Sequence, residues 1–375
     1  FRSYIPDFDK ELRAKFPDQK ITKAEYNDFI DKDAIAGDTL NAIAHFMIGM
    51  GFLSAGSDNW DDLAKYMDTK HIGVLQESYE SILKKVVTDD RKVVGDDPYN
   101  INDKSYGNNI LMTENAGYGT LYGGVIAAKR NNNVGMDGIA DNVELMTLRI
   151  DADYYGEPYM KDMALAIRYA VDHGADIIQM GKGNSFFPIN QSDWVKDALV
   201  YAESKGVLVV MAMRDLAYNL DEVPFYPNKH ISATKDLTNF ITVAASDANG
   251  NPLPSANFSK TELDMFAPGK DIYSTYTADT YRSFSSSDMA ASVVSGTAAL
   301  IKSYYPKLTG TQLRTILMES VTPRVDAEVE KQFYILENKK PKNIAKDLFL
   351  FEDLCVSGGI LNAYKALQAA DKMSK

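Results

Sequence analysis

The chain has 375 residues, of which 45% are hydrophobic and 25% charged, and its net charge is −12. This composition is typical of a globular protein long enough for one large domain or two average ones. The acidic charge and the lack of a basic stripe argue against a nucleic-acid partner, because phosphate binding needs a basic face. A single cysteine, Cys355, excludes a disulfide framework and a cysteine-built metal site, and we expect it to be a buried structural thiol.

The chain has no run of about 18 apolar residues, so the sequence predicts no transmembrane segment. Its first residue is Phe1 rather than an initiator methionine, and no signal peptide precedes it. We therefore expect this sequence to be a processed or trimmed piece of a longer protein.

The first quarter of the chain has helical patterns. A capping box runs from Thr22 to Glu25, and apolar residues at helical spacing run from Leu40 to Ile48 and from Leu75 to Val86. The sequence therefore predicts a helical subdomain over residues 1–90 and an α/β domain over residues 91–375.

Strand and helix patterns alternate in the remainder. The predicted strands are Val143–Ile150, Ala175–Gly181, Gly206–Ala212 and Asn239–Ser246, and the predicted helices are Met163–Val171, which ends before Gly174, and Trp194–Lys205. These strands are apolar on both faces, which indicates a parallel sheet covered by helices on both sides. In such sheets ligand sites form in the loops at the carboxyl ends of the strands.

Several blocks in this order resemble the subtilisin-like serine peptidases, most closely the bacterial branch with a long helical insert. They include "YGTLYGGVIAA", "AIRYAVDHGADIIQMGKG", "GVLVVMAMRDLAYN" and "SSDMAASVVSGTAALIKSYYP", and the resemblance runs from about Val94 to Ala370. It implies a subtilisin-like three-layer α/β sandwich with a mostly parallel central sheet, plus an N-terminal helical insert subdomain. It also implies a bacterial setting in the periplasm, at the cell surface or outside the cell.

The residues at the family's catalytic positions differ. Its histidine block opens His-Gly-Thr-His, and here Tyr118 stands in place of the first histidine. Its serine block reads Gly-Thr-Ser-Met-Ala-Ala-Pro, and here Asp288 stands in place of the nucleophilic serine. Its oxyanion turn reads Ala-Gly-Asn, and here Asp215 replaces the asparagine. The strand that carries the family's aspartate has only a poor imitation in Ile72–Ser78, so the α/β domain is expected to lack its first strand.

These replacements remove the chemistry that the family uses. Tyrosine, with a reference pKa of about 10, is a poor base at neutral pH. Loss of the serine or the histidine alone typically costs about 10⁶-fold in turnover. An ionised Asp215 would repel a developing oxyanion. The sequence therefore predicts a catalytically inactive peptidase homologue that binds a peptide, a protein or another ligand, with no cofactor. Asp288 is expected to remain as a cap of the following helix, and Arg214 to pair with Asp288 or Asp215.

Other hypotheses stay open at this point. The chain could be an active or conditionally active serine endopeptidase whose missing N-terminal segment supplies the aspartate, or a structural component of a surface assembly. A displaced catalytic histidine, a nucleophile shifted to Ser285–Ser287, and a cation held by Tyr118, Asp215 and Asp288 are each less favoured; no metal site is expected. Candidates to line a substrate groove are Gly181, Lys182, Gly183, Met213 and Arg214. Three further glycines are expected to allow tight packing of the helix in the histidine block: Gly119, Gly123 and Gly124.

Overall fold

A computed structural model describes residues 95–112, 116–150, 159–181, 183, 192–232, 234–337 and 340–375. These residues belong to the second of two units into which the chain divides, Phe1–Val93 and Val94–Lys375. The helical subdomain predicted over residues 1–90 and the segment Ile72–Ser78 lie outside the described residues, so both stay predictions.

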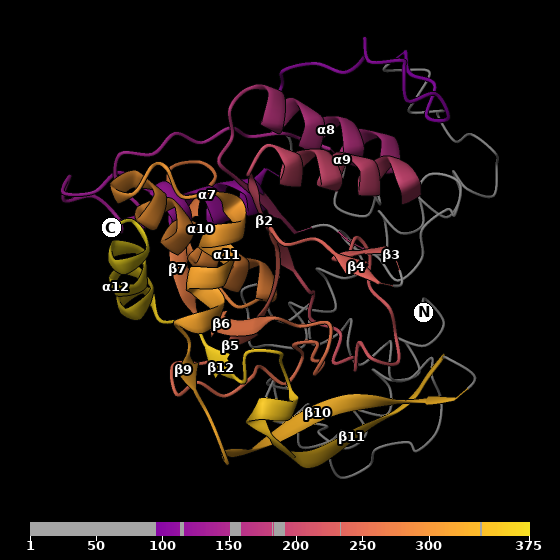
Figure 1. Ribbon diagram of the computed structural model, residues 1–375, viewed down its shortest axis with the longest axis vertical. Helices are drawn as coiled ribbons and strands as arrows, with labels where there is room; N and C mark the ends of the chain where they lie inside the picture. The colour runs from indigo at the N-terminus through magenta and orange to yellow at the C-terminus, as the bar shows by residue number, and fades with distance from the viewer. Residues whose placement is uncertain are drawn as a thin grey trace, which may run out of the picture. The chain divides into compact units, whose positions relative to one another are not determined.

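The second unit is built on a six-stranded sheet (Figure 1). Its spatial order is β1-β2-β5-β6-β12-β9, and the strands are β1 (Ile177–Met180), β2 (Leu208–Ala212), β5 (Phe240–Ser246), β6 (Met265–Pro268), β12 (Gly359–Ile360) and β9 (Thr322–Pro323). All neighbouring pairs are parallel except β12 and β9. The predicted α/β class with a mostly parallel central sheet is confirmed.

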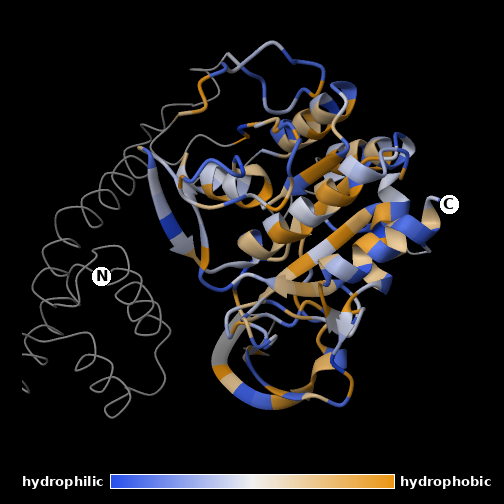
Figure 2. Cartoon of the chain, turned by 90° about the vertical axis from the view of Figure 1, so that its left-hand side faces the viewer, coloured by the Kyte–Doolittle hydropathy of each residue, from blue (hydrophilic) through white to orange (hydrophobic). Residues whose placement is uncertain are grey.

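The central strands are apolar because both of their faces are covered. Every residue of β2 and β5 is buried, which is the burial expected of parallel strands between helices. Figure 2 shows hydrophobic colour along the strands and on the sides of the helices that face them.

Six helices of the described part surround the sheet. They are α7 (Gly117–Ala127), α8 (Met160–Asp172), α9 (Ser192–Ser204), α10 (Ser287–Tyr304), α11 (Gly310–Glu319) and α12 (Ala363–Met373), with a short 3-10 turn η2 (Phe351–Asp353). The helix α10 packs along β5 and β2. Small residues such as Ala290 and Ala291 line its buried side, which lets the helix axis approach the sheet closely, and Gly296 leaves room for Ile139.

Three antiparallel hairpins complete the described fold. They are β3 (His230–Ser232) with β4 (Lys235–Asp236), β7 (Ile272–Tyr276) with β8 (Thr280–Phe284), and β10 (Glu328–Glu337) with β11 (Lys340–Leu350). The sequence analysis did not predict the β10–β11 hairpin.

The predicted strand over residues 143–150 is wrong. The structure assigns no strand there, and Leu145, Met146 and Leu148 are exposed. A strand exists only where its main chain pairs with a neighbour, and an apolar sequence alone does not provide that partner. The other strands and helices predicted within the described residues are confirmed to within a few residues at their ends.

The helix α7 packs against β7, and the contact is close at Gly124. A Cβ atom built on Gly124 would lie 2.2 Å from Thr275 Oγ1 and 2.4 Å from Ser274 Oγ. Gly119, on the same helix, is exposed, and nothing lies within 4 Å of its Cβ position. Close packing is therefore confirmed at Gly124, whereas the expectation of it at Gly119 is wrong because this residue faces away from the neighbouring elements.

This contrast gives a paired test. We expect Gly124→Ala to lower the free energy of unfolding by about 1–3 kcal/mol, because the methyl group would displace the Ser274 and Thr275 side chains. We expect Gly119→Ala to leave stability unchanged or to raise it by up to about 1 kcal/mol, since alanine favours helix. Urea unfolding followed by circular dichroism compares the two variants. Equal losses in both would contradict the packing described for α7.

Candidate functional site

The site lies where the N-terminus of α10 meets the turn after β2. Ser286 is the N-cap of α10, and its Oγ accepts a hydrogen bond of 3.2 Å from the Met289 main-chain N–H. Asp288 lies in the first turn of the helix. The expectation that Asp288 caps the helix is therefore wrong, because the chain already supplies a serine two residues earlier with the extended backbone that a cap requires.

Asp215 also holds the start of α10. Its Oδ2 accepts from the Ser287 N–H at 2.8 Å, and its Oδ1 accepts from the Ser287 hydroxyl at 2.7 Å. Burial raises the pKa of Asp215, while these hydrogen bonds and then the charges of Lys331 and Arg214 lower it. Both carboxylate oxygens thus act as acceptors at a helix N-terminus, where negative charge is favoured.

Asp288 lies against Gly181 and Tyr122. A Cβ atom on Gly181 would be 2.3 Å from Asp288 Oδ1, so only glycine leaves room for this carboxylate. Burial raises the pKa of Tyr122 well above its usual value, and the charge of Asp288 and a hydrogen bond with it add to the shift. The Asp288 carbonyl oxygen accepts from the Ser292 hydroxyl at 2.9 Å.

Tyr118 packs as an aromatic side chain. Its ring meets Phe284 edge-on with centroids 5.5 Å apart, and Tyr122 at 6.3 Å. All three rings lie around a small core formed by Leu121, Val125 and Met289. Tyr122 thus contacts both Tyr118 and Asp288, and it brings the histidine and serine positions of the sequence prediction into one cluster.

The groove candidates have different surroundings. Gly181 borders Asp288, and Gly183 is buried beneath Phe225 and the Tyr226 carbonyl oxygen. Arg214 has a left-handed φ of +57° and donates from Nη1 to the Gly183 oxygen at 3.3 Å. Lys182 lies outside the described residues.

Met213 does not line a groove, contrary to the sequence prediction. It is 1% exposed and belongs to the main core, because it continues the fully buried strand β2. Its side chain points into the core and does not line an open groove.

The described histidines do not serve as a displaced base. His173 follows α8, where its Nδ1 contacts the Tyr169 oxygen. His230 has both ring nitrogens in contact with carboxylates, Nδ1 with Asp236 at 2.6 Å and Nε2 with Glu262 at 2.9 Å. No hydroxyl is bonded to either ring. His45 and His71 lie outside the described residues.

A shifted nucleophile is also disfavoured at Ser287. This side chain is fully buried, and its Oγ donates to Asp215 while it accepts from the Ala245 N–H at 3.1 Å. A hydroxyl held on both sides inside the protein has no approach to a substrate carbonyl.

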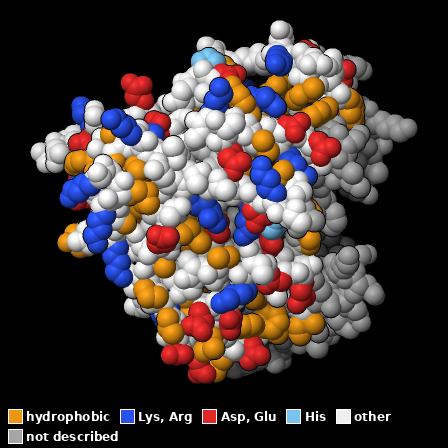
Figure 3. All heavy atoms as spheres, viewed as in Figure 1, with side chains coloured by type: hydrophobic (Ala, Val, Ile, Leu, Met, Phe, Trp, Pro, Cys, Tyr) orange, Lys and Arg blue, Asp and Glu red, His pale blue; other side chains and the backbone are white. Residues whose placement is uncertain are grey.

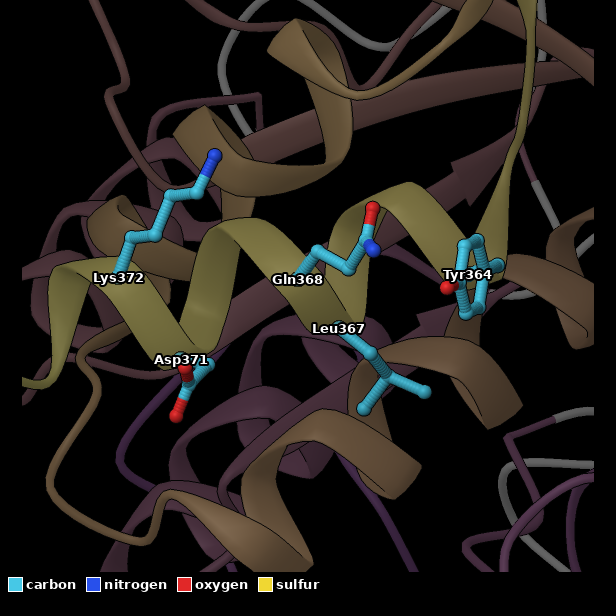
Figure 4. A pocket seen from close by; sticks show the side chains of 5 residues that line it. All are labelled: Tyr364, Leu367, Gln368, Asp371 and Lys372. Atoms are coloured by element: carbon cyan, nitrogen blue, oxygen red, sulfur yellow. The ribbon is translucent and has the colours of Figure 1, made fainter.

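The described part of the chain offers no metal centre. No group of three or more histidine, cysteine or acidic residues there could hold a metal ion. A surface hollow on α12 is lined by Tyr364, Leu367, Gln368, Asp371 and Lys372 (Figure 4). Their polar ends point in different directions, so they do not converge on a ligand. Within the same described residues, no helix is long and apolar enough to cross a membrane.

Comparison with known proteins assigns the chain to a family. The model of the subtilase family matches residues 30–334, which is more than half of the chain. The chain belongs to the subtilase family.

Over the aligned residues, curated subtilases are about a third identical to this chain. Subtilisin DY of Bacillus licheniformis is 33% identical over 236 residues, which cover 62% of this chain and 78% of that protein. Thermitase of Thermoactinomyces vulgaris is 32% identical over 187 residues, or 50% of this chain and 61% of thermitase. A solved structure of proteases from Pseudoalteromonas arctica PAMC 21717 is similar in fold, with a TM-score of 0.52 at 22% identity over 72% of this chain and 74% of that one.

The sequence did not predict the roles of three residues at this site. Tyr122 could have been found, since it follows Tyr118 by four residues and shares its helix face. Ser287 stands next to the substituted nucleophile, but nothing in the sequence shows where its hydroxyl points. Lys331 lies far along the chain, so only the fold brings it to Asp215.

Lys331 is a buried cation on β10 that acts on the site by its charge. Its side chain is fully buried, and its Nζ donates to the Pro254 and Gln332 carbonyl oxygens at 2.7 and 2.8 Å. Burial lowers the pKa of Lys331 to about 7, although the charge of Asp215 raises it. The charge that Lys331 contributes near Asp215, in the turn after β2, therefore changes near neutral pH.

The first prediction concerns the cap. We expect Ser286→Ala to cost about 0.5–2 kcal/mol of unfolding free energy, because the Met289 N–H loses its acceptor. Ser283→Ala, at an exposed serine of the preceding strand β8, should cost less. Thermal or urea unfolding of both variants measures the difference. An equal or larger loss at Ser283 would show that the Ser286 cap contributes no stability of its own.

A second prediction follows from the titration of Lys331. Its pKa is about 7 when folded and about 10.4 when exposed in the unfolded chain. Between these pH values the unfolded state binds the extra proton, so the contribution of Lys331 to stability rises as pH increases from about 7 to about 10. We expect the urea midpoint of the wild type to rise relative to that of Lys331→Met over this range. Lys346→Met, at an exposed lysine of the same hairpin, should show no such change. A pH-independent difference for Lys331→Met would contradict the lowered pKa.

Proposed function

We propose that this chain is a non-catalytic member of the subtilase family that binds a peptide or protein segment at the site formed by the turn after β2 and the start of α10. The observation that carries the proposal is the pairing of Asp215 with Ser287. Asp215 lies at the position that is expected to donate a hydrogen bond to an oxyanion, and here it accepts hydrogen bonds instead. The pairing also engages the hydroxyl of Ser287, the serine next to the predicted nucleophile position.

The other residues of the site also support a loss of catalysis. A peptidase of this kind needs a nucleophile with an adjacent base and donors aimed at the developing negative charge. Here the nucleophile position holds a carboxylate, and the base position holds a phenol packed against Phe284. Among the described residues of the cluster, Tyr122 cannot act as the base, because burial and Asp288 hold its pKa well above the usual value.

What supports binding is that the scaffold of the site persists. Gly181 and Gly183 remain at the carboxyl end of β1, where loops of parallel sheets form ligand sites. Arg214 holds the Gly183 oxygen and joins the two sides of this site. A bacterial envelope or extracellular setting fits the known subtilases to which the chain is similar, and we include it in the proposal.

Labelling tests the loss of catalysis. We expect no covalent adduct in intact-mass spectra after incubation with a fluorophosphonate, because no described serine of the site has a free hydroxyl beside a base. An active subtilisin treated in parallel provides the positive control. Stoichiometric modification mapped to any serine would favour a conditionally active endopeptidase instead.

Casein separates binding from cleavage. We expect fluorescein-casein to bind the chain, with a rise in anisotropy, and to remain intact on gels. Asp288→Ser combined with Tyr118→His should also release no fragments, because Asp215 would still face the oxyanion. Turnover by this double variant would show that the site remains organised for hydrolysis. Failure of casein to bind or to be cleaved would favour a structural role.

A further inference from the structure

The β10–β11 hairpin offers a surface other than the proposed cleft. Its inner face is held to the core by rings, with the Phe258 centroid 5.5 Å from Phe349 and 6.3 Å from Phe333. The Tyr334 N–H on β10 donates to the Ala217 oxygen at 3.0 Å. Within the described residues, β11 pairs with β10 and with no other strand, so its far edge is open.

The open strand carries an apolar face. The register with β10 places Ile344, Leu348 and Leu350 on the same side of the hairpin, at alternate positions. They are 50%, 62% and 38% exposed. Figure 3 shows hydrophobic side chains mixed with acidic ones over this hairpin, at the bottom of the view. Exposed apolar side chains on an open edge are the features that pair with another strand.

Backbone protection of this edge strand is confined to the tip of the hairpin. A register shift lies between Ile335 and Leu336, opposite the part of β11 that contains Pro341. Prolines and bulges of this kind block strand addition. From Ile344 to Leu350 the ladder is regular. In this half the Leu348 N–H donates to Asp347 Oδ1 at 2.8 Å, a bond that an added strand would replace.

The charges on this half select the partner. Lys346 lies on the apolar face, where its Nζ is 3.2 Å from Glu330 Oε1, and Asp347 lies on the other face. Two copies could pair their β11 edges about a two-fold axis. If Ile344 lies opposite Leu348 of the other copy, the axis passes through Lys346, and the two Lys346 residues face each other. If Ile344 lies opposite Leu350, the axis passes through Asp347, and the two Asp347 residues face each other. Each arrangement brings identical charges face to face, which destabilises the pair. In the two registers that set Ile344 opposite another of these apolar residues, a second copy is therefore a poor occupant.

We propose that the edge from Ile344 to Leu350 binds an extended strand of another protein in antiparallel register. The strand has the pattern apolar, any, apolar, basic, acidic, any, apolar. Its apolar residues lie opposite Leu350, Leu348 and Ile344, its basic residue opposite Asp347 and its acidic residue opposite Lys346. Main-chain hydrogen bonds provide the affinity, and these cross-strand pairs provide the selectivity.

The test uses two synthetic peptides on the intact chain. The first is fluorescein-Thr-Val-Thr-Val-Lys-Glu-Thr-Val-Thr-amide, and the second has the Lys and Glu exchanged. We expect saturable anisotropy for the first and about fivefold or greater weakening for the second, since two attractive pairs become repulsive. The double variant Lys346→Glu, Asp347→Lys should reverse this preference.

Matched variants separate docking from folding. Leu348→Lys should lose both peptides while keeping its circular dichroism spectrum, and Tyr364→Lys, at an equally exposed residue on α12, should bind as the wild type does. Casein binding at the cleft should not change in either variant, which distinguishes this proposal from the proposed function. Equal binding of both peptides, binding of neither, or self-association abolished by Leu348→Lys would each overturn the proposal.

Discussion

The pairing of Asp215 with Ser287 is the interaction on which the described site depends. Asp215 follows β2, Ser287 opens α10, and the Ser287 hydroxyl also accepts from Ala245 in β5. One side chain pair therefore ties two central strands to the longest described helix. Because both carboxylate oxygens are used as acceptors, the turn cannot donate to a substrate oxygen through this residue. In the proposed function, the interaction that holds the site together is also the one that replaces the catalytic donor.

A buried carboxylate needs compensation, and the fold supplies it from a distant part of the chain. Lys331 lies on the β10–β11 hairpin, which also bonds to Ala217 and packs the Tyr334 ring, tilted, against Tyr218 just after Asp215. The hairpin thus contacts the turn by charge, by a main-chain hydrogen bond and by ring packing. Movement of the hairpin on binding a strand would therefore reach the cleft through this turn. The amphipathic outer face and the buried Lys331 thus belong to one element, the β10–β11 hairpin.

The sequence predicts those parts of the fold that local pattern determines. The strands β2 and β5 and the helices α8 and α9 follow from runs and periods of apolar residues. The segment 143–150 is also rich in apolar residues but forms no strand, because strand formation depends on a neighbour that pattern does not reveal. The sequence identifies Tyr118, Asp215 and Asp288 as substituted positions, and the fold brings the last two to one helix end. It does not reveal that Ser286 is the cap or that Ser287 is bound to Asp215, since these depend on side-chain direction at a turn.

Gly181 shows how a residue retained in a subtilase can take another role. In a working groove, a glycine beside the substrate is explained by the close approach of a peptide backbone. Here the atom that its missing Cβ would meet is Asp288 Oδ1, at 2.3 Å. A carboxylate is larger than the hydroxymethyl group of serine, and it fits at the nucleophile position because Gly181 leaves space and Tyr122 bonds to it. Alanine at residue 181 would therefore conflict with the aspartate before any ligand arrives. The presence of this glycine is explained by the substitution at residue 288, so by itself it does not demonstrate a working peptide groove.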